Sequence, residues 1–382
     1  MTTIFDLLEQ FRQAKTSNRN LGDQFERLFA NYLVTDPQYA DQFDAVWLWP
    51  EWPDRTGADV GIDLVARDRY TGEYCAIQCK FFDPNSTLQK SDIDSLFTAS
   101  GKHPFTSRII VCTTDHWSTH AEEALHNQQI PVIRLRVQDL ANSPIDWSQF
   151  SLSRPQNIKR LPRKEIRPHQ QVALDKVVAG LKNGDRGKLI MACGTGKTFT
   201  SLKIAEHVVP PHGIVLFLVP SISLLSQSLR EWTAEAQSLH SFAVCSDIKV
   251  GKKSESEDIS TADLAFPATT DPHKLAQQLS FVGKKQLTVI FSTYQSIAVI
   301  AAAQARGLPE FDLIICDEAH RTTGVTLEGD EESHFVRVHD QQFVRGKKRL
   351  YMTATPRIFS DGTKSQAQEN DATLCSMDDP AL

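Results

Sequence analysis

The chain has 382 residues, of which 41% are hydrophobic and 23% charged, so it is long enough for two globular domains and too polar for an integral membrane protein. Its first residues carry no basic start followed by an apolar run, and a cytoplasmic location is expected. The net charge of −6 excludes a basic coat over the whole surface, so any contact with nucleic acid is expected to be local. Seven cysteines without a CxxC pair favour buried thiols over structural zinc.

Residues 1–150 alternate helical and strand-like patterns, which is typical of a small α/β domain. The first helix is indicated by apolar residues that fall on one face: Leu21, Phe25, Leu28, Phe29 and Tyr32. An apolar, aromatic run covers 43–49. Further strands are expected at 62–66, 74–82, 108–113 and 131–135, and helices at 91–100 and 118–127.

Two of these strands carry residues that suit metal-dependent chemistry. Asp63 opens one strand, and Gln78 and Lys80 lie in the next. Side chains alternate along a strand, so Gln78 and Lys80 share a face, and the expected pairing brings Asp63 to the same side. A carboxylate and an amide oxygen suit a hard cation such as Mg²⁺, and the ammonium of Lys80 could steady a developing phosphate charge. The alternative is that these are ordinary surface polar residues; Asp59, between glycines, is more typical of a turn.

Residues 151–166 form an expected linker between domains. The pattern lapses there into Ser, Pro and Asn with a basic run. This run could be a solvated tether or could contact DNA phosphates, and the sequence leaves both open. It comprises Arg154, Lys159, Arg160, Arg163, Lys164 and Arg167.

Residues 167–360 show apolar strands separated by helices, a pattern that indicates a parallel sheet covered on both faces. Within this region, residues 251–270 are rich in Ser, Glu, Lys and Thr, and we expect a flexible insertion there. The strands are expected at 188–192, 214–219, 242–246, 287–292, 311–316 and 349–353.

A phosphate-binding loop is indicated at the first of these strand-to-helix junctions, in Met191-Ala-Cys-Gly-Thr-Gly-Lys-Thr198. Backbone N–H groups of Gly194, Thr195 and Gly196 can turn onto phosphate, Lys197 can reach the β and γ oxygens, and the hydroxyl of Thr198 can bind magnesium. Met191 stands where the general motif has glycine.

A second motif, Asp317-Glu318-Ala-His320, follows an apolar strand. At the end of that strand Asp317 can hold the magnesium ion, and Glu318 can polarise the attacking water. The two motifs in this order predict an ATP-binding domain that uses ATP and Mg²⁺.

With these motifs, residues 167–358 resemble the first RecA-like lobe of a superfamily 2 helicase or translocase. The resemblance implies an adenine contact for Gln170, and contacts with the nucleic-acid backbone for 219–227 and 292–296. It also implies that Thr353-Ala-Thr-Pro356 couples hydrolysis to movement, with His320 as its partner. Such loops would let an acidic protein follow DNA.

The N-terminal pattern Asp-x14-Gln-x-Lys resembles the PD-(D/E)XK nucleases, in particular Mrr-like endonucleases with Gln in place of the second acid. Glu26 matches a further acidic position of that family. A nuclease of this kind in front of a translocase lobe resembles the N-terminal part of a type ISP restriction–modification enzyme. The resemblance implies ATP-driven translocation on double-stranded DNA, with Mg²⁺-dependent cleavage.

The second RecA-like lobe of such motors supplies arginines to the ATP site, and only 26 residues follow Pro356. We therefore expect 361–382 to be the start of a truncated remainder. The second lobe and the methyltransferase and target-recognition regions would come from the same or an adjacent polypeptide. Hydrolysis of ATP by this chain alone is expected to be poor. The alternatives are a type I restriction motor subunit, which normally has an acid at the position of Gln78, or a DNA-binding helicase-like protein that does not cleave.

Overall fold

The computed structural model describes residues 2–13, 17–55, 57, 61–126, 128–150, 157–245, 261–264, 268–281, 286–326, 334–360 and 373–378. The chain divides into two compact units. The first, here the N-terminal domain, comprises Met1–Arg163 and Ile259–Pro267; the second, here the C-terminal domain, comprises Lys164–Asp258 and Ala268–Leu382. The division after Arg163 falls inside the expected linker, whose Arg154 lies outside the described residues. No helix in the described ranges is long and apolar enough to cross a membrane.

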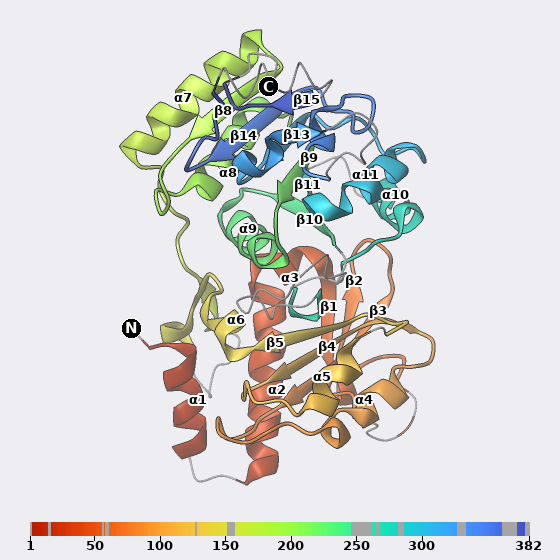
Figure 1. Ribbon diagram of the computed structural model, residues 1–382. Coiled ribbons are helices and arrows are strands. Elements are labelled where there is room, and N and C mark those ends of the chain that lie inside the picture. Colours follow the sequence, from red (N-terminus) through yellow and green to blue (C-terminus); the bar gives the residue numbers. More distant parts are fainter. Residues whose placement is uncertain are drawn as a thin grey trace. The chain divides into compact units, whose positions relative to one another are not determined.

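The N-terminal domain is built on a five-stranded sheet in the order β1-β2-β3-β4-β5 (Figure 1). β1 to β3 pair antiparallel, and β3 to β5 pair parallel. The strands are β1 Phe43–Leu48, β2 Leu64–Asp68, β3 Tyr74–Lys80, β4 Phe105–Cys112 and β5 Val132–Arg136. The helices are α1 Ile4–Gln13, α2 Asn18–Thr35, α3 Pro37–Gln42, α4 Asp94–Ala99, α5 Thr119–Leu125 and α6 Val137–Ala141, and a short pair β6 Ile145–Asp146 and β7 Lys159–Arg160 follows.

The sequence explains how the sheet is covered. Ser17 caps α2 by accepting a hydrogen bond from the N–H of Asn20, which satisfies a donor of the first turn. Phe25 of that helix packs its ring on Phe81, with the centroids 5.7 Å apart. On the opposite face, Leu96 of α4 and residues of α5 pack on strand residues in one buried cluster. The helix expected around Leu21–Tyr32 is therefore confirmed.

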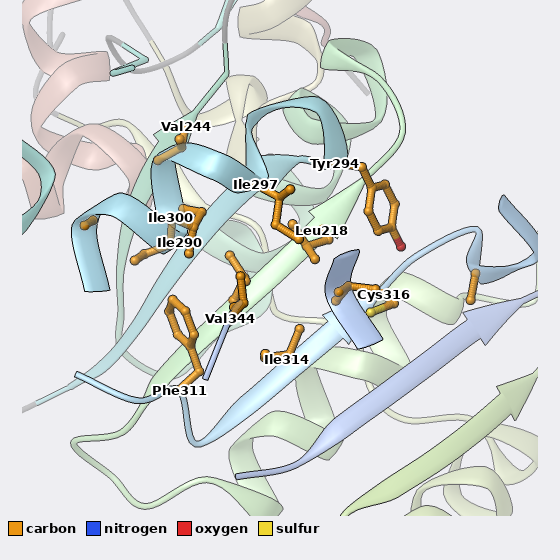
Figure 2. Packing of buried hydrophobic residues seen from close by; sticks show 14 of the residues in the cluster. Leu218, Val244, Ile290, Tyr294, Ile297, Ile300, Phe311, Ile314, Cys316 and Val344 are labelled. Atoms are coloured by element: carbon orange, nitrogen blue, oxygen red, sulfur yellow. The ribbon is translucent and has the colours of Figure 1, made fainter. Parts of the chain in front are cut away.

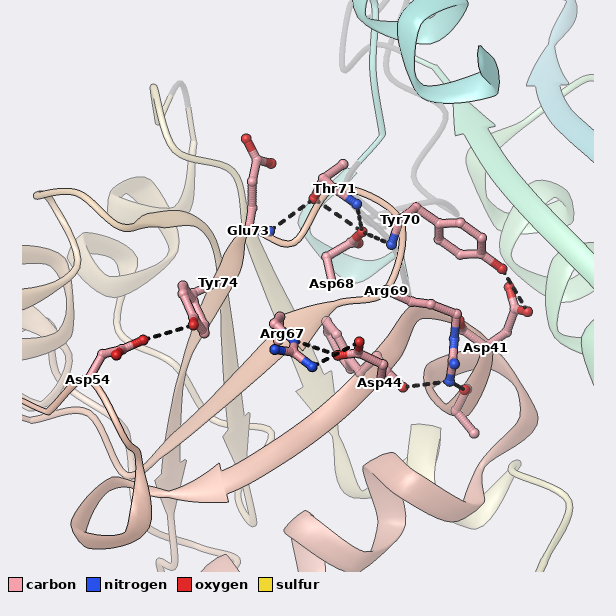
Figure 3. Close-up of polar contacts among 12 residues, drawn as sticks. Asp41, Asp44, Asp54, Arg67, Asp68, Arg69, Tyr70, Thr71, Glu73 and Tyr74 are labelled. Carbon is pink, nitrogen blue, oxygen red and sulfur yellow. Dashed lines mark hydrogen bonds and ion pairs between the residues drawn. The ribbon is translucent and has the colours of Figure 1, made fainter. Parts of the chain in front are cut away.

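The turn between β2 and β3 is fixed to the corner between α3 and β1 (Figure 3). Arg69 donates hydrogen bonds to the carbonyl oxygens of Asp41, Ala40 and Phe43, at 2.9, 3.0 and 3.1 Å. Its guanidinium thus satisfies carbonyls at the end of α3 that have no partner within the helix. In the turn itself, Oδ1 of Asp68 accepts from the N–H of both Tyr70 and Thr71. These bonds help to fix the pairing of β2, which Asp63 directly precedes, with β3, which carries Gln78.

One segment of the N-terminal domain comes from far along the chain. Thr261–Asp263 forms a 3-10 helix (η5), and Ala262 is buried in the cluster between the sheet and α4 and α5. Asp263 pairs with Arg134 of β5. The expected flexible insertion 251–270 is therefore wrong at 261–264; its residues 251–260 and 265–267 lie outside the described ranges.

The C-terminal domain contains the expected parallel sheet, and its six strands lie in the order β10-β11-β9-β12-β14-β8. A separate two-stranded antiparallel sheet is formed by β13 and β15, so Thr373–Cys375 pairs with Gly324–Thr326. The strands are β8 Arg186–Ile190, β9 Ile214–Val219, β10 Leu239–Val244, β11 Leu287–Thr293, β12 Leu313–Cys316, β13 Gly324–Thr326, β14 Arg349–Thr353 and β15 Thr373–Cys375. The helices are α7 Pro168–Asn183, α8 Lys197–Val208, α9 Ile222–Glu235, α10 Pro272–Phe281 and α11 Ile297–Gln304.

Apolar strand residues pack against α10 and α11 to form the core on one face of this sheet (Figure 2). Leu218, Ile290 and Ile314 come from three neighbouring strands, and each is fully buried. Tyr294 and Cys316 lie at the end of this cluster where the strands finish. In a parallel sheet the carboxyl ends of the strands meet at one edge, which is where ligands bind in such folds.

Candidate functional site

The phosphate-binding loop follows β8 and leads into α8. Gly194 and Gly196 have φ values of +75° and +85°, a left-handed conformation that L side chains rarely adopt. Lys197 and Thr198 begin α8, so the loop presents N–H groups at a helix N-terminus. All residues of the loop are at least partly exposed, and this arrangement suits a bound phosphate chain.

Gln170 holds this loop from α7. The side chain is 4% exposed; Oε1 accepts from the N–H of Arg167 at 2.9 Å, and Nε2 donates to the carbonyl of Thr195 at 3.0 Å. A Cβ at Gly196 would lie 2.4 Å from the same Nε2. The sequence predicted only an adenine contact for Gln170, which stays a prediction. Its contact with the loop was missed, because it joins residues 25 positions apart.

Asp317 and Glu318 follow β12 at the same edge of the sheet. The pKa of Asp317 is raised to about 6, chiefly by burial and to a smaller extent by the charge of Glu318, against the opposing effects of the N–H of Glu318 and the ammonium of Lys197. Lys197 and Asp317 therefore lie within electrostatic reach of each other. Glu318 has φ 48° and ψ 46°. This left-handed conformation costs a residue with a side chain roughly 1–2 kcal/mol, and such strain is typical of functional sites.

The segment that begins at Thr353 contacts both His320 and the phosphate-binding loop at the carboxyl ends of the parallel strands. Nδ1 of His320 lies 3.1 Å from Oγ1 of Thr353 and 3.3 Å from Oε2 of Glu318, so the pairing expected for His320 is present. The N–H of Met191 donates to the carbonyl of Thr353 at 3.1 Å. The segment 292–296 meets 219–227 through Gln295, whose Nε2 donates to the carbonyl of Pro220 at 3.3 Å.

In the N-terminal domain, Asp63 lies one residue before β2, at the end of the strand pair where β3 finishes. Its Oδ2 accepts from the N–H of Cys79 at 2.6 Å, directly between Gln78 and Lys80. Its own N–H donates to the carbonyl of Ile77 at 2.9 Å. The acid is thus fixed to the main chain beside the other two predicted residues.

Gln78 is held in one orientation by its amide nitrogen. Nε2 donates to the carbonyl of Gly61 at 2.9 Å and to Oγ of Ser95 at 3.3 Å. The side chain is 1% exposed, and Oε1 is buried without a hydrogen-bond partner among the described residues. A buried polar oxygen of this kind is costly and calls for an explanation. Both amide hydrogens have acceptors, so the carbonyl oxygen is the one polar atom of this side chain left without a partner among the described residues.

Three of the predicted site residues, Asp63, Glu26 and Lys80, lie near the thiol of Cys79. Burial raises the pKa of Cys79 well above its ordinary value, Asp63 and Glu26 raise it further, and Lys80 lowers it. All three charged groups therefore lie close enough to act on the same sulfur atom. Glu26 is brought there by α2, which packs on β3.

These residues fit a hard divalent cation. The described residues hold no group of three or more His, Cys, Asp or Glu that could bind a metal, so a site here depends on the amide oxygen of Gln78. Carboxylate, amide oxygen and water are the ligands that Mg²⁺ prefers. In the C-terminal domain, Thr198 and the buried Asp317 offer the same chemistry. Asp59 lies outside the described residues.

Ser95 and Gly61 were not recognised from the sequence. Gly61 has φ +87°, and a Cβ there would lie 2.3 Å from Oγ of Ser95, so glycine is required by both strain and space. The glycine itself, two residues before Asp63, was the signal that the sequence offered. Ser95 gave none, since it lies on α4, 17 residues after Gln78.

Comparison with known proteins gives the same two parts. Residues 34–157 match a family described as restriction endonuclease, and residues 163–358 match the type III restriction enzyme, res subunit. The solved structure of the ATP-dependent Type ISP restriction-modification enzyme LlaBIII bound to DNA matches 99% of this chain, with TM-score 0.81 and 39% identity, and the match covers 24% of that chain.

Curated relatives match about half of this chain. A probable helicase, A859L, of African swine fever virus (isolate Tick/Malawi/Lil 20-1/1983) is 30% identical over 195 residues, which is 50% of this chain and 20% of the relative. The chain therefore spans about a fifth of the length of such relatives. It thus consists of a nuclease-like domain followed along the chain by a RecA-like helicase lobe, which matches the type ISP structure.

Proposed function

This chain belongs to the family of the type III restriction enzyme res subunit, and from that premise we propose that it is the nuclease and motor part of a restriction enzyme. In this proposal it moves along double-stranded DNA at the expense of ATP and cleaves foreign DNA with Mg²⁺. The similar type ISP enzyme was solved bound to DNA, which supports a DNA substrate for this chain as well.

In the motor, the N–H groups of Gly194, Thr195 and Gly196 bind the phosphates of ATP, and Lys197 contacts the β and γ oxygens. Thr198 and Asp317 would hold Mg²⁺, which screens the charge that develops on the transferred phosphoryl group. Glu318 orients the attacking water, and His320 links Glu318 to Thr353. Gln170 holds the loop closed through Thr195 and contacts the adenine.

In the nuclease, Asp63 and Oε1 of Gln78 would hold a divalent cation, which lowers the barrier to attack by polarising a phosphate oxygen and a water. Lys80 stabilises negative charge on the phosphate, and Glu26 orients the water through its carboxylate. Ser95 and Gly61 keep the amide of Gln78 turned so that its oxygen points to the ion. The buried, unpartnered Oε1 of Gln78 is the observation that carries the nuclease part of the proposal.

Cleavage of a supercoiled plasmid with Mg²⁺ tests this part. Asp63→Ala and Lys80→Ala are expected to abolish cleavage, and full cleavage by either variant would show that the site is wrong. If the unsubstituted chain binds DNA but never cleaves it, the alternative of a non-cleaving DNA-binding protein replaces the nuclease. A type I motor subunit would instead require a separate methyltransferase subunit for activity.

Binding of ATP tests the motor part separately. Lys197→Ala is expected to abolish binding of Mg·ATP and to leave any ATP-independent nicking intact. A polypeptide of residues 1–382 by itself is expected to hydrolyse ATP slowly, because the arginines of a second lobe accelerate phosphoryl transfer by roughly 10³ to 10⁵ in comparable enzymes. Rapid hydrolysis stimulated by DNA would contradict this expectation.

A further inference from the structure

Arg12 of α1 lies close to the predicted nuclease residues of the N-terminal domain. Its guanidinium is placed over the ring of Phe81, 5.4 Å from the centroid. Phe81 directly follows Lys80, and its ring packs on that of Phe25, which directly precedes Glu26 on α2. Arg12 is therefore one aromatic ring away from the end of the strand that carries Lys80.

Strand geometry gives the distance between Arg12 and the predicted site. Cys79 and Phe81 are two residues apart, and α2 brings Glu26 to the first and packs on the second. Side chains two residues apart on an extended chain share a face and are roughly 7 Å from each other. A DNA strand carries a phosphate about every 3.4 Å along its axis. A strand with one phosphate at the predicted site therefore brings a neighbouring phosphate within reach of Arg12.

Most donors of the Arg12 guanidinium are unused. Its one hydrogen bond among the described residues runs from Nη1 to Oε2 of Glu9, at 3.4 Å, and that carboxylate is 55% exposed. Nε is buried and has no partner in the same ranges, while the side chain as a whole is 20% exposed. The side chain is thus packed at Nε, and the outer edge of the guanidinium is left to bind an acceptor from solvent.

Other arginines of this domain that lie over aromatic rings have their donors occupied. Arg67 donates from Nε and Nη2 to the two carboxylate oxygens of Asp44, at 2.8 and 3.1 Å. Arg108 and Arg134 each make at least three hydrogen bonds. Arg12 differs from these three in having a charged, partly exposed group without a close partner among the described residues.

We propose that Arg12 is a substrate-binding residue of the nuclease, and that its guanidinium contacts a DNA backbone phosphate next to the one that is cleaved. This inference rests on the proposed nuclease function. Arg12 lies before residues 34–157, the region that matches the restriction endonuclease family. The planar fork of an arginine can bind two phosphate oxygens at once, and the ring of Phe81 holds it ready, so little side-chain freedom is lost on binding.

The test uses the full chain and the salt dependence of DNA binding. The dissociation constant of a 30-base-pair duplex is measured over a range of KCl concentrations without Mg²⁺, so that the duplex stays intact. In Arg12→Gln the slope of log Kd against log [KCl] is expected to fall by about 0.9, the share of one phosphate contact. The KM for plasmid cleavage with Mg²⁺ is expected to rise about tenfold, with kcat changed less than about twofold.

Arg67→Gln is the matched control. It removes the same charge from the same domain, and Arg67 also lies over a ring, that of Trp47, 5.8 Å from the centroid. Because Asp44 already occupies its donors, the slope and the KM are expected to stay unchanged. Arg12→Lys keeps the charge and is expected to keep the slope. Thermal unfolding checks that each variant folds, and a purely structural role of Arg12 would lower stability without changing the slope.

Two results would overturn the inference and leave the nuclease standing. One is an unchanged slope and KM in a folded Arg12→Gln variant that still cleaves plasmid. The other is an equal change in Arg67→Gln, which would show a general effect of charge. If the unsubstituted chain never cleaves DNA, the proposed nuclease is refuted, and the inference with it.

Discussion

Both carboxylate oxygens of Asp263 accept hydrogen bonds from the guanidinium of Arg134, from Nε at 2.8 Å and from Nη2 at 3.0 Å. The two residues are 129 positions apart in sequence. The Arg134 side chain is 3% exposed and that of Asp263 10%. Arg134 also pairs with Glu122 and lies over the ring of Trp117, 5.2 Å from its centroid. A buried charge is costly unless it is paired. Asp263 therefore stabilises the domain by neutralising Arg134, whose side chain is buried on β5.

We predict that Asp263→Asn destabilises the N-terminal domain by about 2 kcal/mol, measured by urea unfolding. Loss of one partner from a buried pair typically costs more than that, but Glu122 remains to pair with Arg134. Asp44→Asn is the control, because Asp44 makes the same two-bond contact with Arg67 in an exposed position. Its effect is expected to stay below about 1 kcal/mol. Equal effects of the two substitutions would contradict the buried pairing.

Gln78→Glu is predicted to lower both stability and cleavage, although an acid is common at this position in related nucleases. A carboxylate would place an oxygen where Nε2 now donates to the carbonyl of Gly61, so a hydrogen bond becomes a repulsion. The expected cost at pH 8 is about 1–3 kcal/mol, and it should shrink in acid, where a protonated acid can donate again. Gln138→Glu, on the exposed surface, is expected to change neither property. The measurements are urea unfolding of both variants at pH 8 and at an acidic pH, and plasmid cleavage at pH 8. A Gln78→Glu variant as stable and as active as the unsubstituted chain would contradict the prediction.

Asp317→Asn is predicted to stabilise the ligand-free protein while abolishing Mg·ATP binding. Burial raises the pKa of Asp317 to about 6 from an ordinary 3.8, so the folded protein binds this proton more tightly than the unfolded chain. The resulting stability is complete below pH 3.8 and is lost as the pH rises through 6. At pH 8 the ionised group therefore costs up to about 3 kcal/mol, which Asn avoids.

The measurement is the difference in unfolding free energy between Asp317→Asn and the unsubstituted chain from pH 4 to pH 8. This difference should grow with pH and level off above about 6.5. Asp175→Asn, at an exposed position on α7, is the control variant. A difference that stays flat with pH would mean that Asp317 is not strained by burial.

The two glycines of the phosphate-binding loop are predicted to differ in their tolerance of alanine. Both have positive φ, but a Cβ at Gly194 meets nothing within 4 Å, whereas one at Gly196 meets Nε2 of Gln170 at 2.4 Å. Gly194→Ala should cost roughly 1–2 kcal/mol from backbone strain alone. Gly196→Ala should cost more, and adding Gln170→Ala should recover the steric part. An additive double variant would show that the two side chains do not collide.

Much of the fold could be predicted because its strands are strongly patterned. β9 and β14 were predicted residue for residue, since both are almost wholly buried and bounded by polar turns. β10 was displaced by three residues at its start, because His240 and Ser241 are polar yet buried. Helix α1 went unpredicted, although Ile4, Leu7, Leu8 and Phe11 have helical spacing.

Long-range contacts account for what the sequence could not reveal. The polar composition of 251–270 favoured a flexible insertion, whereas the burial of Ala262 and the pairing of Asp263 with Arg134 and Arg136 hold 261–264 on the N-terminal domain. The predicted residues Asp63, Gln78 and Lys80 are close in sequence and belong to a recognisable spacing. Ser95 has no motif of its own, and its contribution depends on how α4 packs against the sheet.

Because the segment 261–264 belongs to the N-terminal domain, it limits how this domain can be exchanged between related proteins by recombination. The N-terminal domain is encoded by two separate stretches of the gene, one of which lies inside the coding region of the C-terminal domain. A recombination or engineered fusion that joined new sequence after Arg163 would transfer a domain without Ala262 and Asp263, leaving a gap in its core and an under-neutralised arginine. Successful grafts of this nuclease-like domain should therefore carry the second stretch with them, or acquire substitutions at Arg134.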